Sequence, residues 1–136
     1  MVELTEGMVV SDLASARAHL TDLRRLGVKI AIDDFGTGFT SLSYLQRLPI
    51  DIVKFDRAFT ADIANDPQAR RLLDGLLRLA DGLEVTSLAE GVETSEQLDV
   101  LRDLRCTLAQ GYLLGEPLVP EDVLDHSETA GVRPSR

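Results

Sequence analysis

The hydrophobic pattern of this chain changes period repeatedly, and this alternation constrains the fold more than any other feature. Short runs of alternating apolar and polar residues, typical of strands, are followed by stretches with apolar residues three or four positions apart, typical of amphipathic helices. A regular succession of strand and helix indicates a parallel sheet with right-handed crossovers in one α/β domain. The predicted strands cover residues 1–5, 28–34, 51–55, 84–90 and 108–113, and the predicted helices cover 11–26, 41–47, 67–82 and 94–105.

Two of these helices begin with recognisable capping residues. Asp66 precedes Pro67, and a proline at the first helical position loses no hydrogen bond. Thr94 followed by Gln97 fits the capping box. The first of the two helices has a stripe of apolar residues that we expect to be buried, made up of Leu72, Leu73, Leu76, Leu77 and Ala80.

Charge and composition narrow the classes of partner. The 136 residues are 44% hydrophobic and carry a net charge of −9. A bare acidic surface repels nucleic-acid polymers and anionic membranes, whereas an anionic ligand can still bind if metal ions lie between it and the carboxylates. No apolar run approaches the ~20 residues of a membrane span, and the N-terminus lacks a secretory pattern. We therefore expect a cytoplasmic protein, with its one cysteine, Cys106, as a small buried apolar residue.

An aspartate pair follows the second predicted strand. Asp33 and Asp34 end the strand, and the loop Gly36-Thr37-Gly38 comes directly after them. Two neighbouring carboxylates repel unless a cation neutralises them or one takes up a proton. The pair therefore fits either a divalent-cation site or a solvated aspartate-rich turn, and on its own it does not decide between them.

The other predicted strands also carry polar groups at or near their carboxyl ends. These groups are Glu3, Lys54, Glu90 and Gln110. In a parallel α/β protein these ends share one face, where active sites form. Lys54 fits either a structural salt bridge with Asp33 or Asp56, or a cation aimed at phosphate or at a metal-bound hydroxide. Glu90 has the same two interpretations.

Several motifs occur together and in order, and as a series they resemble the EAL family of cyclic-di-GMP phosphodiesterases. The resemblance runs from about Val2 to Pro117. The motifs are Glu3-Leu4-Thr5-Glu6, Ile32-Asp33-Asp34-Phe35-Gly36-Thr37-Gly38, Val53-Lys54-Phe55-Asp56-Arg57, Ala89-Glu90-Gly91-Val92-Glu93-Thr94 and Ala109-Gln110-Gly111-Tyr112.

The resemblance implies a modified TIM barrel and a role for each matching residue. Lys54 matches the lysine that orients the attacking water, and with Glu90 it is a catalytic candidate. Glu6 matches the glutamate that holds the loop after the aspartate pair, residues 35–43, which includes Gly36, Thr37 and Gly38. Glu93 and Gln110 match further polar residues of the site. The implied ligands of two Mg²⁺ or Mn²⁺ ions are Glu3, Asp33, Asp34 and Glu90.

Two family motifs are absent, namely the Glu-Ala-Leu motif and an Asn-x-Ser motif, which both belong to an N-terminal half. We therefore expect an incomplete (β/α)8 TIM-type barrel, with residues 1–126 as the C-terminal portion of an EAL domain and 127–136 as a mobile tail. The expected function is two-metal hydrolysis of cyclic di-GMP to linear pGpG, needing the missing half. The alternatives are a non-catalytic module that binds cyclic di-GMP or a protein, and an inactive truncated fragment. The resemblance implies a homodimer or upstream sensory or regulatory domains as further partners.

Overall fold

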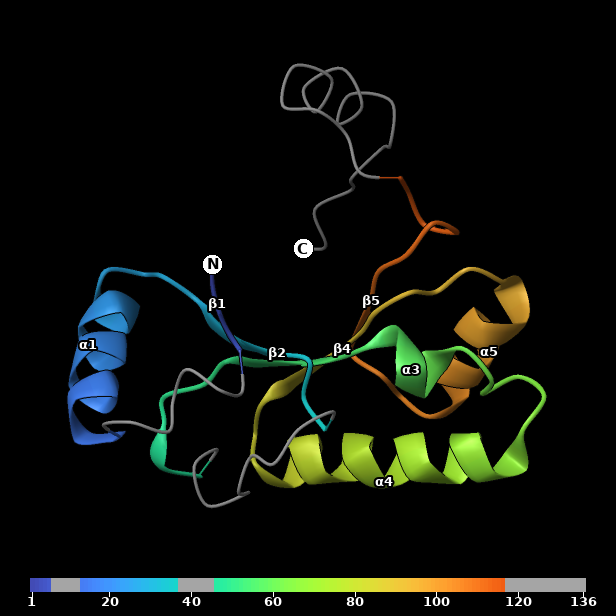
Figure 1. Ribbon diagram of the computed structural model, residues 1–136, viewed down its shortest axis with the longest axis horizontal. Helices are drawn as coiled ribbons and strands as arrows, with labels where there is room; N and C mark the ends of the chain where they lie inside the picture. Colours follow the sequence, from blue (N-terminus) through green and yellow to red (C-terminus); the bar gives the residue numbers. More distant parts are fainter. Residues whose placement is uncertain (6–12, 37–45, 117–136) are drawn as a thin grey trace, which may run out of the picture.

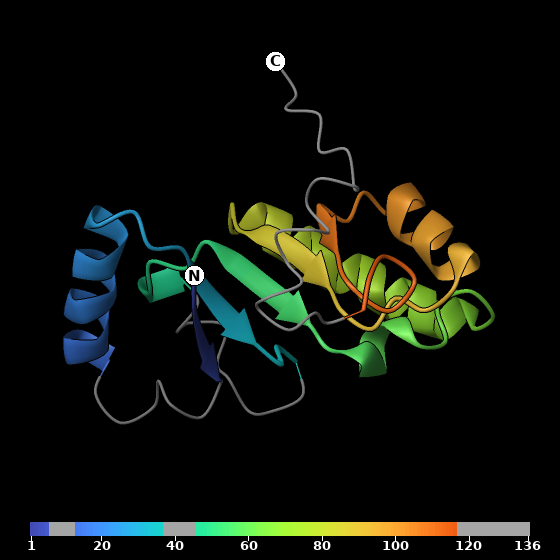
Figure 2. The same ribbon diagram turned by 90° about the horizontal axis from the view of Figure 1, so that it is seen from above.

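A computed structural model of the chain describes residues 1–5, 13–36 and 46–116. These residues form a five-stranded parallel sheet whose strand order follows the chain, β1-β2-β3-β4-β5 (Figure 2). Because β1 and β5 each pair on one side only, both are edges and the sheet does not close. This arrangement confirms the predicted α/β fold with five parallel strands. The strands are β1 (Val2–Thr5), β2 (Ile30–Asp33), β3 (Ile52–Phe55), β4 (Thr86–Ala89) and β5 (Leu108–Ala109).

Helices connect β1 to β2, β3 to β4 and β4 to β5, as the alternating pattern predicted. In Figure 1, α4 lies below the sheet, α1 lies beyond the β1 side and α5 lies near β4 and β5. The short helix α3 was not predicted. It begins after Asp56, whose carboxylate accepts a hydrogen bond from the amide of Ala58. The helices are α1 (Leu13–Arg25), α3 (Arg57–Thr60), α4 (Pro67–Gly82) and α5 (Ser95–Asp103).

The hydrophobic core lies between the sheet and the helices. Phe55 on β3, Ala89 on β4 and Leu73 on α4 are all completely buried. Alternation along each strand places their neighbours Lys54 and Leu88 on the other face of the sheet. One face of the sheet therefore packs in the hydrophobic core, while the opposite face carries polar groups at the carboxyl ends of the strands.

The capping predictions for α4 and α5 are confirmed. The carboxylate of Asp66 accepts a hydrogen bond from the amide of Gln68, and Pro67 lies in the first turn. Thr94 and Gln97 form both hydrogen bonds of a capping box. The predicted stripe of α4 is wrong at Leu72, which is 54% exposed, because successive helical residues point about 100° apart and Leu73 takes the buried direction.

The last strand is shorter than predicted. β5 covers two residues rather than residues 108–113, so Gln110 follows the strand instead of lying within it. The chain turns after Gln110, and the amide of Leu114 donates to the carbonyl of Gly111 at 2.9 Å. This turn ends the pairing with β4 and leaves Tyr112 exposed.

Several predictions fall on residues that the structure does not describe. They include Glu6, Thr37 and Gly38, most of the helix predicted over residues 41–47, and the tail 127–136. Within the described ranges, no helix is long and apolar enough to cross a membrane.

Candidate functional site

Parallel pairing brings the polar strand ends to one edge of the sheet. Glu3 lies on β1, Asp33 ends β2 and Lys54 lies on β3. Glu90 directly follows β4, and its amide donates to the carbonyl of Phe55 on the neighbouring strand at 2.9 Å. Side chains from four consecutive strands therefore meet in one place.

Lys54 lies at the centre of this group. Its ammonium Nζ is 2.8 Å from Glu90 Oε1, 2.9 Å from Asp33 Oδ1 and 3.2 Å from Glu3 Oε2. The Lys54 side chain is 7% exposed. Burial alone would lower the pKa of Lys54, but the hydrogen bonds to Glu90, Asp33 and Glu3 outweigh burial and raise the pKa above its ordinary value. Lys54 is therefore a cation at neutral pH.

The loop after β2 holds the aspartate pair in a specific conformation. Asp34 has a positive φ of 54°, which is uncommon for a residue other than glycine, and its amide donates to Asp33 Oδ1 at 3.1 Å. The next residue, Phe35, is buried and packs edge-on against Phe55, with ring centroids 6.0 Å apart. The buried ring anchors the loop, so Asp33 and Asp34 stay together at the end of β2.

Three carboxylates of this group could share a metal ion. Asp33, Asp34 and Glu90 each offer an oxygen, and these oxygens lie within 4.8 Å of one another. Glu3 joins the group through its ion pair with Lys54. Carboxylate oxygens are the ligands that Mg²⁺ and Mn²⁺ prefer, so the donor set fits these ions. The carboxylates of Glu3, Asp33 and Glu90 also share the single ammonium of Lys54, and this concentration of negative charge favours a bound cation.

Glu90 is positioned by residues on both sides of it. Gln110 Nε2 donates to Glu90 Oε1 at 2.6 Å. On the other side, the Thr60 hydroxyl donates to the backbone carbonyl of Glu90, also at 2.6 Å, and Thr60 is completely buried. The sequence patterns identified Gln110 but missed Thr60, because its helix α3 spans only four residues and is too short to show a period.

The remaining predicted site residues lie beside the carboxylate group. Glu93 pairs with Arg57, with Arg57 Nη1 3.1 Å from Glu93 Oε1 and Arg57 Nη2 3.2 Å from Glu93 Oε2. Gly36 follows the aspartate pair and has a φ of +91°. Asp56, one of the two partners considered for Lys54, caps α3 instead.

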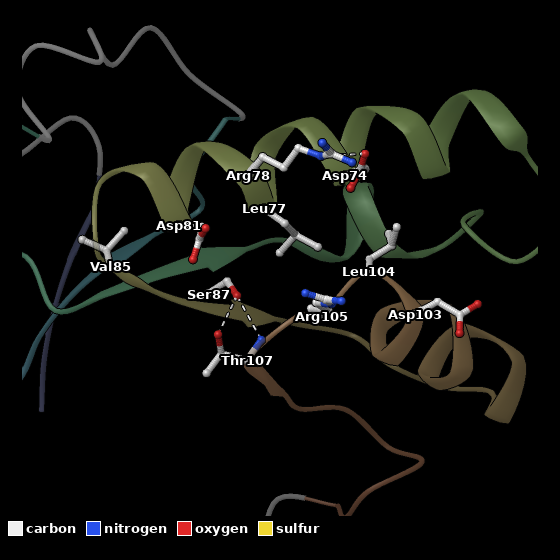
Figure 3. A pocket seen from close by; sticks show the side chains of 10 residues that line it. All are labelled: Asp74, Leu77, Arg78, Asp81, Val85, Ser87, Asp103, Leu104, Arg105 and Thr107. Atoms are coloured by element: carbon white, nitrogen blue, oxygen red, sulfur yellow. Dashed lines mark hydrogen bonds and ion pairs between the residues drawn. The ribbon is translucent and has the colours of Figure 1, made fainter.

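A separate cavity lies away from these residues. It has a volume of about 530 Å³ and lies between the C-terminal ends of α4 and α5 and the starts of β4 and β5 (Figure 3). Ser87 faces it and accepts a hydrogen bond from the amide of Thr107 at 3.0 Å. None of the predicted site residues lines it, so it does not extend the carboxylate group.

Comparison with known proteins identifies the family. The EAL domain family matches residues 1–117. A Mycobacterium tuberculosis protein is 43% identical over 129 residues, covering 95% of this chain and 20% of its own length. The cyclic di-GMP phosphodiesterase NbdA of Pseudomonas aeruginosa is 43% identical over 117 residues, covering 86% of this chain and 15% of its own length.

Solved structures give the same result. The EAL domain of Mycobacterium smegmatis DcpA matches with a TM-score of 0.87 and 38% identity, covering 97% of this chain and 59% of that domain. A manganese and cyclic-di-GMP complex of Klebsiella pneumoniae BlrP1 matches with a TM-score of 0.72 and 37% identity, covering 82% of this chain and 28% of that one. The chain thus spans about a fifth or less of these curated relatives' length. The five-stranded sheet, the order of the motifs and these matches show that the chain belongs to the EAL domain family.

Proposed function

We propose that this chain supplies the carboxylate and lysine part of a site that hydrolyses cyclic di-GMP to linear pGpG. The observation that carries the proposal is the Lys54 ammonium held between Glu3, Asp33 and Glu90, with Asp34 beside them. Relatives named as cyclic di-GMP phosphodiesterases, and solved structures named as cyclic-di-GMP complexes, support this choice of substrate.

Four carboxylates are the proposed ligands of divalent metal, Mg²⁺ or Mn²⁺. They are Glu3, Asp33, Asp34 and Glu90. Structures of BlrP1 named as calcium and manganese complexes support the use of divalent ions in the family. When bound, two such ions supply an activated water and stabilise the leaving oxygen of a phosphodiester.

The chain's own residues orient the reacting groups. The Lys54 ammonium provides a fixed positive charge toward the phosphate and the attacking water. Glu90 lies against this ammonium and is held by Gln110, so its carboxylate keeps one orientation. We propose Lys54 and Glu90 as the catalytic residues, with Gln110 positioning Glu90. Glu93, Glu6 and the loop residues Gly36, Thr37 and Gly38 are proposed to support the substrate.

We also propose that turnover needs the part of the EAL domain that this chain does not cover. The chain corresponds to 59% of the DcpA domain, and the sheet formed by its described residues is open at β1 and β5. If water replaces part of the ligand set, the site should bind its metal ions more weakly and hold them in a less regular coordination geometry. A homodimer, or upstream sensory or regulatory domains, are the protein partners that we propose for the intact protein.

The test compares the chain alone with the chain fused behind the N-terminal part of the DcpA EAL domain. Each protein is incubated with cyclic di-GMP and Mg²⁺ or Mn²⁺, and pGpG is measured by chromatography. We expect negligible product from the chain alone and clear turnover from the fusion, abolished by Asp34→Ala. A fusion that folds but makes no pGpG with either metal would count against the proposal. Robust turnover by the chain alone would refute the need for the remaining part.

A second candidate is a binding module without catalysis, which the open sheet favours. Such a module would bind cyclic di-GMP saturably in calorimetry while the fusion makes no product. Absence of both affinity and product would instead indicate an inactive fragment.

A further inference from the structure

The cavity of Figure 3 lies at the amino end of β4, whereas Glu90 follows the carboxyl end of the same strand. Its volume of about 530 Å³ falls within the range of small-molecule sites. Ser87 on β4 and Leu77 on α4 contribute buried side chains to its lining. It shares no residue with the carboxylate group, so it is a separate place on the molecule. We call it the amino-end cavity.

Several charged groups that line the amino-end cavity are already paired. Arg78 Nε lies 3.1 Å from Asp74 Oδ2, and both residues line the cavity. Asp103, a third lining residue, has its Oδ2 atom 3.1 Å from Arg70 Nη2. Each pair joins one acid to one base. Neither pair therefore leaves a net charge for a ligand to neutralise.

Asp81 and Arg105 are the two charged lining residues that remain. Within residues 1–5, 13–36 and 46–116, neither side chain forms a hydrogen bond or an ion pair. Figure 3 shows them on either side of Ser87. They line one cavity without contacting each other. A ligand that carries both an ammonium and a carboxylate would neutralise both, through charge-assisted hydrogen bonds at each end.

The position of Asp81 favours a positively charged ligand group. Asp81 lies in the last turn of α4, and no basic residue is present in that turn. The carboxyl end of a helix carries a partial negative charge, so a carboxylate there is unfavourable unless a cation lies nearby. A ligand ammonium beside Asp81 would interact favourably with both the carboxylate and the helix end.

Arg105 occupies a backbone position that suits glycine. It follows α5 with a positive φ of 59°, and its amide donates to the carbonyl of Arg102 at 3.0 Å. Gly27 takes the same position after α1, with a φ of 82° and a corresponding bond to Arg24 at 2.9 Å. Glycine adopts positive φ without strain, whereas other residues rarely do. The arginine gives no advantage to the backbone, but its planar guanidinium offers paired donors to a carboxylate.

The rest of the lining is largely apolar or already satisfied. Leu77, Val85 and Leu104 contribute aliphatic side chains. The Ser87 hydroxyl donates to Thr107 Oγ1 at 3.2 Å and accepts from the Thr107 amide at 3.0 Å, so it needs no ligand. A ligand that fills this cavity therefore presents aliphatic surface as well as two opposite charges.

We propose that the amino-end cavity binds a free α-amino acid with an aliphatic side chain. The carboxylate of the amino acid binds the guanidinium of Arg105, and its ammonium binds the carboxylate of Asp81. Its side chain packs against Leu77, Val85 and Leu104. This inference is independent of the proposed hydrolysis of cyclic di-GMP, because it uses no residue of the carboxylate group.

The test measures binding of L-leucine to the full chain by calorimetry, together with three analogues. Leucinamide lacks the carboxylate, N-acetyl-L-leucine lacks the ammonium, and glycine lacks the aliphatic side chain. We expect saturable binding of leucine. Each analogue should bind about tenfold more weakly or worse, because it loses one charge-assisted contact or the apolar contact.

Two substitutions test the assigned residues. Arg105→Gly should weaken leucine about tenfold or more, while the midpoint of urea unfolding should not fall, because glycine suits the positive φ at this position. Loss of binding and retained stability together exclude a merely structural role. Asp81→Asn should weaken leucine by a similar factor and leave the affinity for N-acetyl-L-leucine unchanged, since that analogue has no ammonium.

Glu84→Gly is the matched control. Glu84 also has a positive φ, of 57°, just after α4, but it does not line the cavity. This variant should therefore keep the affinity for leucine. The inference would be overturned by absence of saturable leucine binding, by equal binding of leucinamide or N-acetyl-L-leucine, or by an unchanged leucine affinity in Arg105→Gly. An equal loss of affinity in Glu84→Gly and Arg105→Gly would also overturn it.

Discussion

At the scale of single residues, Lys54 places one positive charge against three carboxylates. Replacing it by methionine keeps most of the apolar stem and removes the charge, so Glu3, Asp33 and Glu90 would repel one another. We expect Lys54→Met to lower the free energy of unfolding by about 1–3 kcal/mol, because these carboxylates are partly exposed and water screens their repulsion. Urea denaturation measures this loss.

Added Mg²⁺ should restore part of the stability of Lys54→Met, because a cation bound to the folded state shifts the unfolding equilibrium toward it. The original chain should gain less, since Lys54 already neutralises part of the charge. Lys29→Met is the control. Lys29 is also paired with an aspartate but is 68% exposed and belongs to a different ion pair. The same Mg²⁺ response in all three proteins would contradict a metal site at this place.

Asp51 makes stability depend on pH at the amino end of the sheet. Its carboxylate is 9% exposed, accepts a hydrogen bond from the amide of Ile30 at 3.0 Å and pairs with Arg24 and Lys29. Burial alone would raise the pKa of Asp51, but these contacts outweigh burial and lower it below its ordinary value. The folded state therefore favours the ionised form. Its stabilising effect is present above the unfolded pKa of about 3.9 and is lost as pH falls through the lower folded pKa.

The substitution Asp51→Asn tests this direction of the pH dependence of stability. The variant should be less stable than the original chain at neutral pH, and the difference should shrink as pH falls below about 4. Asp99→Asn is the control, because Asp99 pairs with Arg102 at an exposed position and should change stability little. If the difference in stability between Asp51→Asn and the original chain stays constant from neutral to acidic pH, ionisation of Asp51 is not linked to folding.

At the scale of elements, replacing glycine by alanine should have opposite effects on stability at two positions. Gly75 lies inside α4 with open space around its Cβ position, whereas a Cβ on Gly111 would meet the backbone of Val92. Gly75→Ala should stabilise the chain by about 0.5–1 kcal/mol through helix propensity. Gly111→Ala should destabilise it by displacing the turn after β5. Thermal and urea unfolding of both variants check the two signs, and a destabilising Gly75→Ala would contradict this account of α4.

The elements that the sequence predicted best are those with local signals. Asp66, Pro67, Thr94 and Gln97 mark the starts of α4 and α5 correctly, because capping depends on residues a few positions apart. The helix α3 and the early end of β5 could not be predicted in this way. Helix α3 is a single turn whose start is capped by Asp56. The end of β5 depends on how closely Gly111 approaches Val92 in the folded chain.

At the scale of the whole molecule, parallel topology made part of the candidate site predictable. Once the strands are aligned, Asp33 and Lys54 must share the carboxyl edge of the sheet, and the structure brings them to 2.9 Å. The contacts of the short helix α3 were not predictable. Arg57 and Thr60 lie on α3, and they contact Glu93 and the carbonyl of Glu90, which lie 36 and 30 positions later in the segment after β4. The hydrophobic periodicity of a sequence gives no information about such a contact.

The open sheet leads to the last prediction, which concerns self-association. Among the residues that the structure describes, β1 and β5 each pair on one side only, and Leu108 on β5 is 43% exposed. Unpaired edges and exposed apolar residues favour pairing with another chain. We therefore expect the sedimentation coefficient to rise with protein concentration. The rise should be steeper at high salt, because the net charge of −9 repels other copies until salt screens it.

Leu108→Lys should shift the chain toward the monomer, since a charge on an edge strand opposes pairing. Leu72→Lys is the matched control because it introduces the same charge at an exposed leucine on α4, away from either edge. If both lysine variants reduce association equally, general charge repulsion explains the effect, and the β5 edge is not the site of association. If Leu108→Lys alone reduces it, the β5 edge carries the contact. That edge is then a place where this sheet can be completed by another polypeptide.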